Sequence, residues 1–405
     1  MATNKEQNKL NVPHLRFPEF HGEWEEHGLS EYLDFKNGLN PDSKRFGKGI
    51  KFISVMDILN NPVITYDCIR ASVQATDAEM SSFSVENGDI LFQRSSETLE
   101  DVGRANVYID DKVAVFGGFV IRGKKKANYN PLFFRYLLSS PYARKRIIPM
   151  GAGAQHFNIG QEGLSKVLLN FPSIEEQTKI ASLLHLLDER ISTQSKLIED
   201  LKKLKSAIID YAINSLDTDF AKFGSLYEMA GEGGTPTTSN ASFYDNGNIP
   251  FIKIDDLKQK YLTENKDFIT ELGLQKSSAW LVPTHSILFS NGATIGEISI
   301  TTYPVCTKQG ILGIVPKQNI DVEFLYYFMS SSYFKKAVSR IVTEGTMKTA
   351  YLKDINNILC PIPTKEKQQE IAKMPSTLNS KIDFEQSILK LFCSQKQHLL
   401  RQMFI

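Results

Sequence analysis

The chain has 405 residues, 41% of them apolar, and its 47 lysine and arginine residues balance 46 aspartate and glutamate residues to a net charge of +1. This length and apolar fraction fit two or three packed domains and exclude a chain that is disordered throughout. The balanced charge excludes a globally basic nucleic-acid binder, so such a function would need local basic patches.

The four cysteines, Cys68, Cys306, Cys360 and Cys393, lie far apart and follow neither a metal-ligand nor a disulfide spacing. Buried, reduced thiols are the simplest interpretation, and they are typical of the cytoplasm. The polar start lacks the features of a secretion signal, and no apolar run is long enough to cross a bilayer. We therefore expect a cytoplasmic protein without a membrane segment.

The dominant feature is an internal repeat. FPSIEEQTKIASLLHLLDERI from Phe171 returns as IPTKEKQQEIAKMPSTLNSKI from Ile362, 191 positions later. Upstream, KFISVMDIL answers PFIKIDDLK, DILFQRS answers SILFSNG, and FFRYLLSSPYARK answers FLYYFMSSSYFKK. A period this long indicates a duplicated domain rather than a solenoid. Two similar but unequal units on one chain favour a target with two unequal parts.

In chain order, the sequence predicts five segments. Residues 1–22 are polar and form an arm, and residues 23–172 hold short β runs broken by turn residues, then a helix. Residues 173–216 form a long helix, residues 217–362 a second globular unit, and residues 363–405 a second long helix. The expected class is α+β, with two pseudo-twofold related globular domains, each followed by a long helix.

The first long helix is predicted to begin at a capping box of Ser173 and Glu176. Its apolar residues alternate at spacings of four and three, as in a coiled coil, and the second helix repeats the stripe. We expect the helices to pack antiparallel as a spacer, with a seam that includes Ile180, Leu184, Leu187, Ile191, Ile198, Leu201, Leu378, Ile382, Leu389 and Phe392. Pro375 should kink the second helix or delay its start.

Two polar positions interrupt each stripe: Gln194 and Lys205 in the first helix, Glu385 and Lys396 in the second. In an antiparallel pair, Gln194 would face Lys396 and Lys205 would face Glu385, which would fix the register. A second interpretation, in which the lysines merely extend from the edge of the seam into water, stays open.

The sequence offers no constellation typical of an enzyme. The glycine-rich GEGGTPT lacks the Gly-Lys-Ser/Thr ending of a phosphate-binding loop. Asp255, Asp256 and Lys258 resemble part of a nuclease metal site, but the matching segment of the first half has neither the second acid nor the lysine. The histidines are scattered and form no catalytic triad pattern. We therefore expect a non-catalytic protein without a metal site.

Basic and polar clusters are the stronger signal. Between Ile121 and Met150 the chain has eight basic residues and no acidic one, so a surface of one sign is predicted there, which would attract duplex phosphates. A solvated charge run is the other interpretation. Polar residues able to read base edges follow a strand in each half. The candidate DNA-binding residues are Gln93, Arg94, Ser95, Ser96, Arg104, Lys124, Lys125, Lys126, Gln155, His156, Asn291, Thr294, Lys308, Gln309, Lys348 and Thr349.

Three stretches carry a family resemblance: the opening VPHLRFPEFHGEWEEHGLSEYLDFKNG, the helix entry FPSIEEQTKIASLLHLLDERI with KLIEDLKKLKSAIIDYAI, and NGATIGEISI with the later Gln309–Gly310. They resemble the specificity subunits of type I restriction-modification enzymes over essentially the whole chain. The resemblance implies two target-recognition domains, each reading one half of a bipartite, asymmetric site in double-stranded DNA. It also implies that the paired helices separate these domains and dock two methylation subunits, which recruit the restriction subunits.

Catalysis would then belong to the partners. The resemblance implies that this chain binds no cofactor, whereas the partner subunits use S-adenosylmethionine, ATP and Mg. Three alternatives stay open: an orphan subunit that supports methylation only, a self-contained nuclease or methyltransferase, and a coiled-coil interaction protein with no role on DNA.

Overall fold

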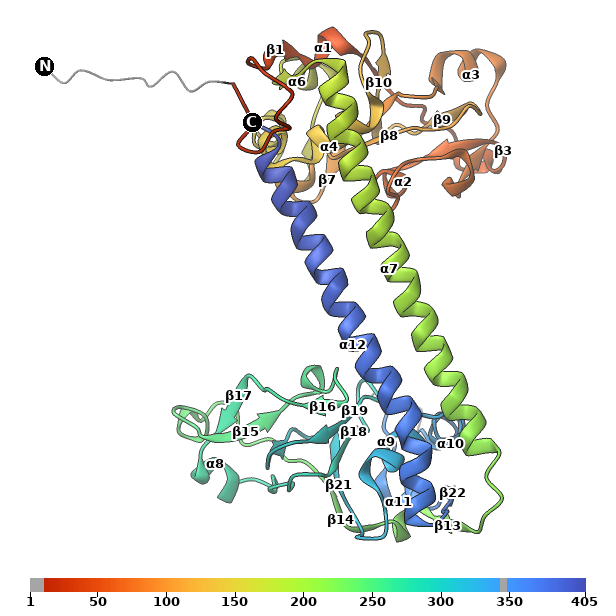
Figure 1. Cartoon of the computed structure of the whole chain (residues 1–405), viewed down its shortest axis with the longest axis vertical. Helices are drawn as coiled ribbons and strands as arrows, with labels where there is room; N and C mark the ends of the chain where they lie inside the picture. The colour runs from red at the N-terminus through yellow and green to blue at the C-terminus, as the bar shows by residue number, and fades with distance from the viewer. Residues whose placement is uncertain (1–10, 343–347) are drawn as a thin grey trace, which may run out of the picture. The chain divides into compact units, whose positions relative to one another are not determined.

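The computed structural model describes residues 11–342 and 348–405, which divide into two compact units (Figure 1). Unit 1 comprises the chain up to Ser195 together with Ile388–Ile405, and unit 2 comprises Lys196–Ser387. Each of the two long helices therefore contributes one end to each unit. Within the described ranges, no helix is both long and apolar enough to span a membrane.

Unit 1 is built on two four-stranded sheets. One has the strand order β2-β10-β6-β8 and is antiparallel, and the other has the order β4-β3-β9-β5, in which β3 and β9 run parallel. Two further pairs join β1 to β12 and β7 to β11. The strands are β1 (Glu25–Gly28), β2 (Leu33–Asn37), β3 (Phe46–Ile53), β4 (Ser72–Val73), β5 (Ser84–Val85), β6 (Ile90–Gln93), β7 (Ser95–Ser96), β8 (Ala105–Val107), β9 (Ala114–Phe116), β10 (Val120–Lys125), β11 (Phe157–Asn158) and β12 (Leu168–Phe171).

Unit 2 repeats this plan with different strand lengths. A five-stranded sheet has the order β14-β21-β18-β19-β16, a three-stranded sheet has the order β17-β15-β20, and β13 pairs with β22 as β1 does with β12. The strands are β13 (Phe220–Lys222), β14 (Tyr227–Glu232), β15 (Ile249–Ile252), β16 (Tyr261–Leu262), β17 (Asp267–Ile269), β18 (Ile287–Ser290), β19 (Ile298–Thr301), β20 (Cys306–Thr307), β21 (Ile311–Pro316) and β22 (Leu359–Pro361).

Short helices accompany the sheets, and two long helices follow them. The short helices are α1 (Leu29–Tyr32), α2 (Val55–Asn60), α3 (Asp77–Phe83), α4 (Pro131–Ser139), α5 (Pro141–Ile147), α6 (Gln161–Ser165), α8 (Glu271–Gln275), α9 (Val322–Ser330), α10 (Ser332–Ile341) and α11 (Leu352–Ile355). The long helices are α7 (Ile174–Asn214) and α12 (Lys365–Gln402), with 41 and 38 residues. These elements confirm the α+β class with a long helix after each globular domain.

Two glutamines that the repeat retains explain why each long helix joins its globular domain in the same way. The Gln177 side-chain oxygen accepts a hydrogen bond from the Asn130 amide, 3.1 Å away at the start of α4. In unit 2, Gln368 accepts one from the Asp321 amide, 2.8 Å away at the start of α9. Both glutamines are buried, and each also donates to a proline carbonyl before its own helix. A buried amide with both ends bonded fixes this joint.

The two long helices pack antiparallel within each unit. In unit 1, Leu184 near the start of α7 shares one hydrophobic core with Leu399 and Phe404 near the end of the chain. In unit 2, Ile213 near the end of α7 shares a core with Ala372 near the start of α12. All ten residues of the predicted seam are buried or half-buried.

Two details at the helix starts differ from the prediction. The Ser173 hydroxyl accepts from the Glu176 amide as a capping box requires, but the Glu176 carboxylate pairs with Arg16 of the arm, 2.7 Å away. The second helix does not begin late, because α12 starts at Lys365 and runs through Pro375, and the alternative of a kink at Pro375 stays a prediction. Proline costs the helix one hydrogen bond, and the burial of Pro375 and of the preceding Ala372 offsets that loss.

The lysines of the seam have partners other than the ones predicted. Lys396 pairs with Asp188 of α7 in unit 1. Lys205 donates to the Asn379 side chain, 2.8 Å away in unit 2. Asp188 and Asn379 are themselves 191 positions apart, so the same contact occurs in each unit, with an acid in one and an amide in the other. Neither lysine simply extends into water.

Candidate nucleic-acid interface

In unit 1, backbone hydrogen bonds bring together three loops that are far apart in the sequence. The Arg94 amide, just after β6, donates to the Phe119 carbonyl at 2.9 Å, in the turn between β9 and β10. The Arg94 carbonyl accepts from the Ile159 amide at 2.9 Å, just after β11. The Ser95 hydroxyl also donates to the Asn158 side chain. The predicted group 93–96 therefore lies next to the loop that holds Gln155 and His156.

Unit 2 builds the same arrangement from its own residues. The Asn291 amide, just after β18, donates to the Gly310 carbonyl at 3.0 Å, in the turn between β20 and β21. The Asn291 carbonyl accepts from the Ala350 amide at 2.8 Å, and Gly292 forms an isolated bridge with Thr349. The structure thus brings together the six residues predicted in this half, Asn291, Thr294, Lys308, Gln309, Lys348 and Thr349.

The predicted residues differ in how accessible their side chains are. Gln93 is 5% exposed and Asn291 is 1% exposed, and their amides donate to the backbone carbonyls of Ser95 and Ala350. Their side-chain oxygens are buried without a hydrogen-bond partner among the described residues. These two residues hold the loops, so a base could reach them only if the loops opened.

The remaining members of both clusters lie closer to solvent. In unit 1, Gln155 and His156 are exposed, whereas Arg94, Ser95 and Ser96 are half-buried. In unit 2 the exposed side chains are Thr294, Lys308, Gln309 and Lys348, and Thr349 is half-buried. One Arg94 guanidinium nitrogen donates to the Gly118 carbonyl at 3.2 Å, which leaves further donors of the fork for a ligand. The two clusters therefore offer different donors and acceptors at equivalent places.

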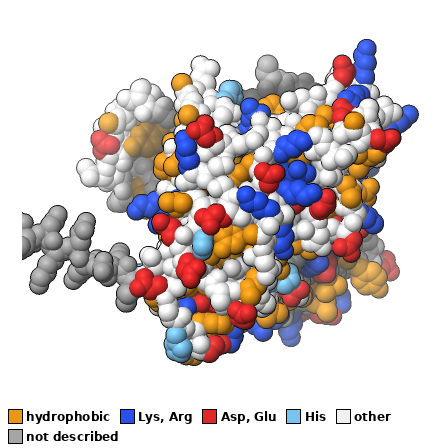
Figure 2. Space-filling model, turned by 90° about the horizontal axis from the view of Figure 1, so that it is seen from above, with side chains coloured by type: hydrophobic (Ala, Val, Ile, Leu, Met, Phe, Trp, Pro, Cys, Tyr) orange, Lys and Arg blue, Asp and Glu red, His pale blue; other side chains and the backbone are white. Residues whose placement is uncertain are grey.

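The basic run between Ile121 and Met150 does not form the predicted surface of one sign. Arg122 is 6% exposed and donates to a backbone carbonyl. Arg135 pairs with Asp188, and Arg144 donates to two backbone carbonyls. The face drawn in Figure 2 carries lysine and arginine side chains intermingled with aspartate and glutamate. Much of this positive charge is thus buried, paired or hydrogen-bonded within unit 1. The sequence alone does not reveal these contacts.

The other basic candidates lie apart from the loop clusters or already have partners. Lys124 and Lys125 end β10 and Lys126 follows it, so the three lie roughly 16 to 23 Å from Phe119 at ~3.3 Å per residue. Lys124 pairs with Glu86 at 3.1 Å, and the Lys125 ammonium donates to a backbone carbonyl at 3.2 Å. Of the three, Lys124 and Lys125 are half-buried and Lys126 is exposed.

Arg104 lies near Arg144 and pairs with Asp101 at 2.6 Å. Burial, with the neighbouring charge of Arg104, lowers the pKa of Arg144 to about 10. Contact of Arg104 or of Lys124–Lys126 with phosphates stays a prediction.

Sequence reasoning missed one part of the unit 1 cluster, the turn that ends at Phe119. Its counterpart in unit 2 holds Lys308 and Gln309, which the sequence did single out. A signal was present, because the strands on either side of both turns repeat, as β9 and β10 in unit 1 and as β20 and β21 in unit 2. Phe119 itself is apolar, so a pattern of polar side chains does not include it.

Asp255 and Asp256, which resemble part of a nuclease metal site in the sequence, serve local structure. Asp255 pairs with Lys258 on the surface, and the Asp256 side chain accepts from the Lys253 amide at 2.9 Å. No group of three or more potential metal ligands occurs among the residues that the structure describes.

Two copies of one α+β domain, each with a cluster of polar loops and each followed by a long helix, define the class of modular recognition proteins. The family model named "Type I restriction modification DNA specificity domain" matches residues 21–203 and again residues 217–391. The chain belongs to this family. It is a DNA-specificity subunit of a type I restriction-modification system, a non-catalytic subunit that works in a complex with other subunits and DNA.

Individual relatives agree with this assignment. The HindI specificity subunit of Haemophilus influenzae is 22% identical over 80% of this chain and 86% of its own length. The MjaIX specificity subunit of Methanocaldococcus jannaschii is 32% identical over 41% of this chain and 39% of its own length. Among solved structures, the S subunit of a type I system from M. genitalium covers 97% of this chain and 99% of its own, with a TM-score of 0.57 and 17% identity. This last similarity concerns the fold.

Proposed function

We propose that the chain reads a bipartite, asymmetric site in double-stranded DNA, one half with each loop cluster. The observation that carries this proposal is the paired contact of Arg94 with Phe119 and of Asn291 with Gly310, which places two unequal clusters at equivalent positions. Base edges in the major groove differ in their pattern of donors and acceptors. Clusters with different side chains would therefore select half-sites of different sequence.

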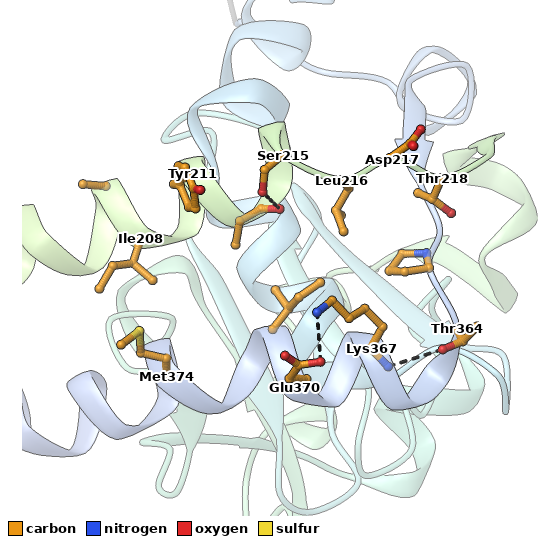
Figure 3. Close-up of a pocket in the computed structure, with 14 residues that line it drawn as sticks. Ile208, Tyr211, Ser215, Leu216, Asp217, Thr218, Thr364, Lys367, Glu370 and Met374 are labelled. Atoms are coloured by element: carbon orange, nitrogen blue, oxygen red, sulfur yellow. Dashed lines mark hydrogen bonds and ion pairs between the residues drawn. The ribbon is translucent and has the colours of Figure 1, made fainter.

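We further propose that the long helices dock two methylation subunits, which in turn recruit restriction subunits. An open groove of about 870 Å³ in unit 2 supports a docking place for one of these subunits, because its lining is largely apolar. In Figure 3, Ile208 of α7 faces Met374 of α12 across the groove. Tyr211 is 77% exposed and Met374 is 60% exposed. Large apolar side chains grouped on a surface are typical of a protein interface.

In unit 1, the arm contacts the corresponding ends of the two long helices. At its corresponding helix ends, the arm residue Leu15 donates its amide to the Gln402 carbonyl at 2.8 Å, and Arg16 pairs with Glu176. In unit 2 only residues 215–219 link α7 to β13, and this short link leaves the groove open. A segment of a partner subunit would take the place that the arm has in unit 1.

The proposal leaves the chemistry to the partners. This chain would bind no cofactor, and the partner subunits would use S-adenosylmethionine, ATP and Mg. The proposal also places the complex in the cytoplasm, in line with the four free cysteine thiols.

The test is to co-express the chain with a methylation subunit and to map methylated adenines across the host genome. We expect two short half-sites of different sequence, separated by a fixed gap of unspecified bases. The chain alone should neither methylate nor cleave DNA. A continuous site, or activity of the highly purified chain by itself, would contradict the proposal.

A further inference from the structure

A hollow of about 480 Å³ opens beside the loop cluster of unit 1, and its lining is mostly apolar. Three large side chains of this lining are unusually exposed: Phe46 at 43%, Met56 at 60% and Phe119 at 68%. Ser95 of the predicted reading group lines the same hollow. None of the lining residues described by the structure carries a charge. Exposed apolar side chains that gather at one place mark a binding site more often than a single one does.

The turn that carries Phe119 is held firmly. The Phe119 carbonyl accepts from the Arg94 amide, and the Val120 amide closes the turn onto the Gly117 carbonyl at 2.8 Å. A Cβ atom at Gly118 would overlap with the Asn40 side chain, so the turn fits closely against its neighbour. The Arg94 guanidinium donates to the Gly118 carbonyl of this turn, so Arg94 is held next to Phe119 and little conformational entropy is lost when a ligand binds.

The charges around the hollow favour a polyanion as the ligand. Lys44, between the lining residues Pro41 and Phe46, is exposed, and so is Lys48, which follows Phe46. Among the described residues, neither lysine forms an ion pair with a carboxylate. Asp42 is the one acid between residues 39 and 56, and it caps the Lys44 amide. An apolar centre with cations at its edge complements DNA better than it complements a neutral or basic protein.

DNA offers one apolar group that fits this centre. In the major groove the C5 methyl group of thymine is the one sizeable apolar group on a base edge, among polar donors and acceptors and the small C5–H of cytosine. We propose that Phe119, with Phe46 and Met56, reads a thymine methyl group in the half-site of unit 1, next to the base that Arg94 contacts. This inference rests on the proposed function, because it needs the loop cluster to face the major groove.

Unit 2 lacks this feature at the equivalent turn. Gly310 occupies the place of Phe119 there, preceded by the exposed Lys308 and Gln309. An apolar reader on one unit and polar readers on the other give the two half-sites different requirements. The inference therefore predicts a thymine contact through this turn in one half-site only.

The experiment uses the complex with the methylation subunit and duplexes that carry the mapped site. Each thymine is replaced in turn by deoxyuridine, which lacks only the methyl group, and Kd is measured for the wild-type complex and for Phe119→Ala. At one thymine the wild-type complex should lose about fourfold in affinity, the factor expected for one buried methyl group. The Phe119→Ala complex should bind the thymine duplex more weakly, with no further loss on deoxyuridine.

Val113→Ala is the matched control, because Val113 is 45% exposed on the same unit but lies before β9, at the strand end away from the Phe119 turn. It should keep the full sensitivity to deoxyuridine. Equal deoxyuridine effects in wild type and Phe119→Ala, or no sensitive thymine, would overturn the inference alone. Weaker assembly with the methylation subunit and unchanged base preference would assign the hollow to a protein partner and also overturn it. A wild-type complex that selects no site would overturn the proposed function as well.

Discussion

Arg94 is the residue whose substitution separates base reading from general attraction to DNA. Its guanidinium donates once to the Gly118 carbonyl, and its other donors can form the bidentate contact that guanine accepts. We expect Arg94→Ala to lose about 1 to 3 kcal/mol of discrimination at one base pair. Arg94→Lys should lose it too but keep the salt-dependent affinity, because lysine retains the charge without the fork. Matched and mismatched duplexes measure both quantities, and an unchanged ratio of Kd values in Arg94→Ala would contradict this role.

Asp188 holds the contact between α4, α7 and α12 in unit 1. It accepts from Arg135 at 3.1 Å and from the Tyr136 hydroxyl at 2.9 Å, and it pairs with Lys396. Asp188→Asn leaves two cations without their carboxylate. We expect a loss of about 2 kcal/mol in the free energy of unfolding of unit 1 at neutral pH, less than for a fully buried pair. Replacing Trp280 by Phe leaves Trp24 as the one tryptophan, so its fluorescence during urea unfolding reports unit 1.

The contribution of Asp188 should also depend on pH. Burial by itself would raise the pKa of this carboxyl, but the hydrogen bond and charge of Lys396, together with Arg135, hold the pKa below its usual 3.8. A lowered pKa in the folded state means stability that is present above pH 4 and lost as the pH falls through the folded-state pKa. The difference between wild type and Asp188→Asn should therefore shrink below pH 4. A constant difference from pH 7 to pH 3 would contradict this assignment.

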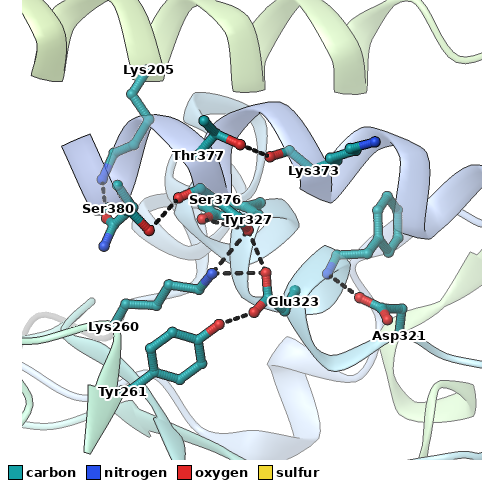
Figure 4. Close-up of polar contacts among 12 residues, drawn as sticks. Lys205, Lys260, Tyr261, Asp321, Glu323, Tyr327, Lys373, Ser376, Thr377 and Ser380 are labelled. Atoms are coloured by element: carbon teal, nitrogen blue, oxygen red, sulfur yellow. Dashed lines mark hydrogen bonds and ion pairs between the residues drawn. The ribbon is translucent and has the colours of Figure 1, made fainter. Parts of the chain in front are cut away.

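Lys260 is a buried cation that unit 2 stabilises with several partners (Figure 4). Its side chain is 3% exposed, and its ammonium group lies 2.8 Å from the Glu323 carboxylate and 3.0 Å from the Ser376 hydroxyl. Lys260→Met leaves Glu323 without its cation, so we expect a loss of about 2 to 4 kcal/mol in the unfolding free energy of unit 2. Lys258→Met is the control, because Lys258 pairs on the surface and should change stability by less than ~0.5 kcal/mol. Equal losses of unfolding free energy in the two variants would show that the buried contact of Lys260 stabilises unit 2 no more than the surface pair of Lys258 does.

At the scale of elements, the helices were predictable and their polar contacts were not. The spacing of apolar residues predicts both long helices, because a helical period needs only local sequence. The partners of Lys205 and Lys396 were missed because a long lysine side chain reaches past its own seam position to flanking residues such as Asp188 and Asn379. The six seam residues predicted in α7 follow from the spacing of apolar residues within that helix, without reference to the partner helix.

The loop clusters show a second limit of the sequence. Polar residues after β6 and β18 could be found from the repeat, but the link between Arg94 and Phe119 depends on the order of strands in a sheet. That order is a matter of contacts between distant segments, which local patterns do not encode. For the same reason the basic run after Ile121 looked free, although β10 and α4 turn Arg122 and Arg135 inward.

The lengths of α7 and α12 should set the gap between the two half-sites. Both helices cross from one unit to the other, α7 after Ser195 and α12 after Ser387. Four residues added to each helix at these points add about one turn, or ~6 Å, and keep the apolar stripe nearly in phase. We expect unchanged half-sites with a gap longer by about two base pairs at ~3.4 Å per step, as read from mapped methylation.

Insertion of two residues at the same points serves as the counter-test. It turns the following stripe by about 200° at ~3.6 residues per turn, so activity should fall instead of the gap growing. An active complex with an unchanged gap after the four-residue insertion would show that these helices do not set the spacing.

At the scale of the whole molecule, each recognition domain should be exchangeable. The first strand of each domain pairs with the strand that precedes its long helix, β1 with β12 and β13 with β22, so both ends of each domain lie together. Replacing residues 23–172 by the corresponding part of a relative should change one half-site and leave the other intact. Methylation mapping of the chimaera gives the result, and a change in both half-sites would disprove independent reading.

The division of the chain into units also bears on how the protein is made. Unit 1 includes Ile388–Ile405, and Leu399, Met403 and Phe404 belong to the same hydrophobic core as Trp24. During synthesis, the half that is made first must therefore wait for residues 388–405 before its core is closed, whereas unit 2 has all its segments by residue 387. A released chain that ended at residue 387 would have every segment of unit 2 but an unfinished unit 1, and chaperones would meet the exposed core of the domain that was synthesised first.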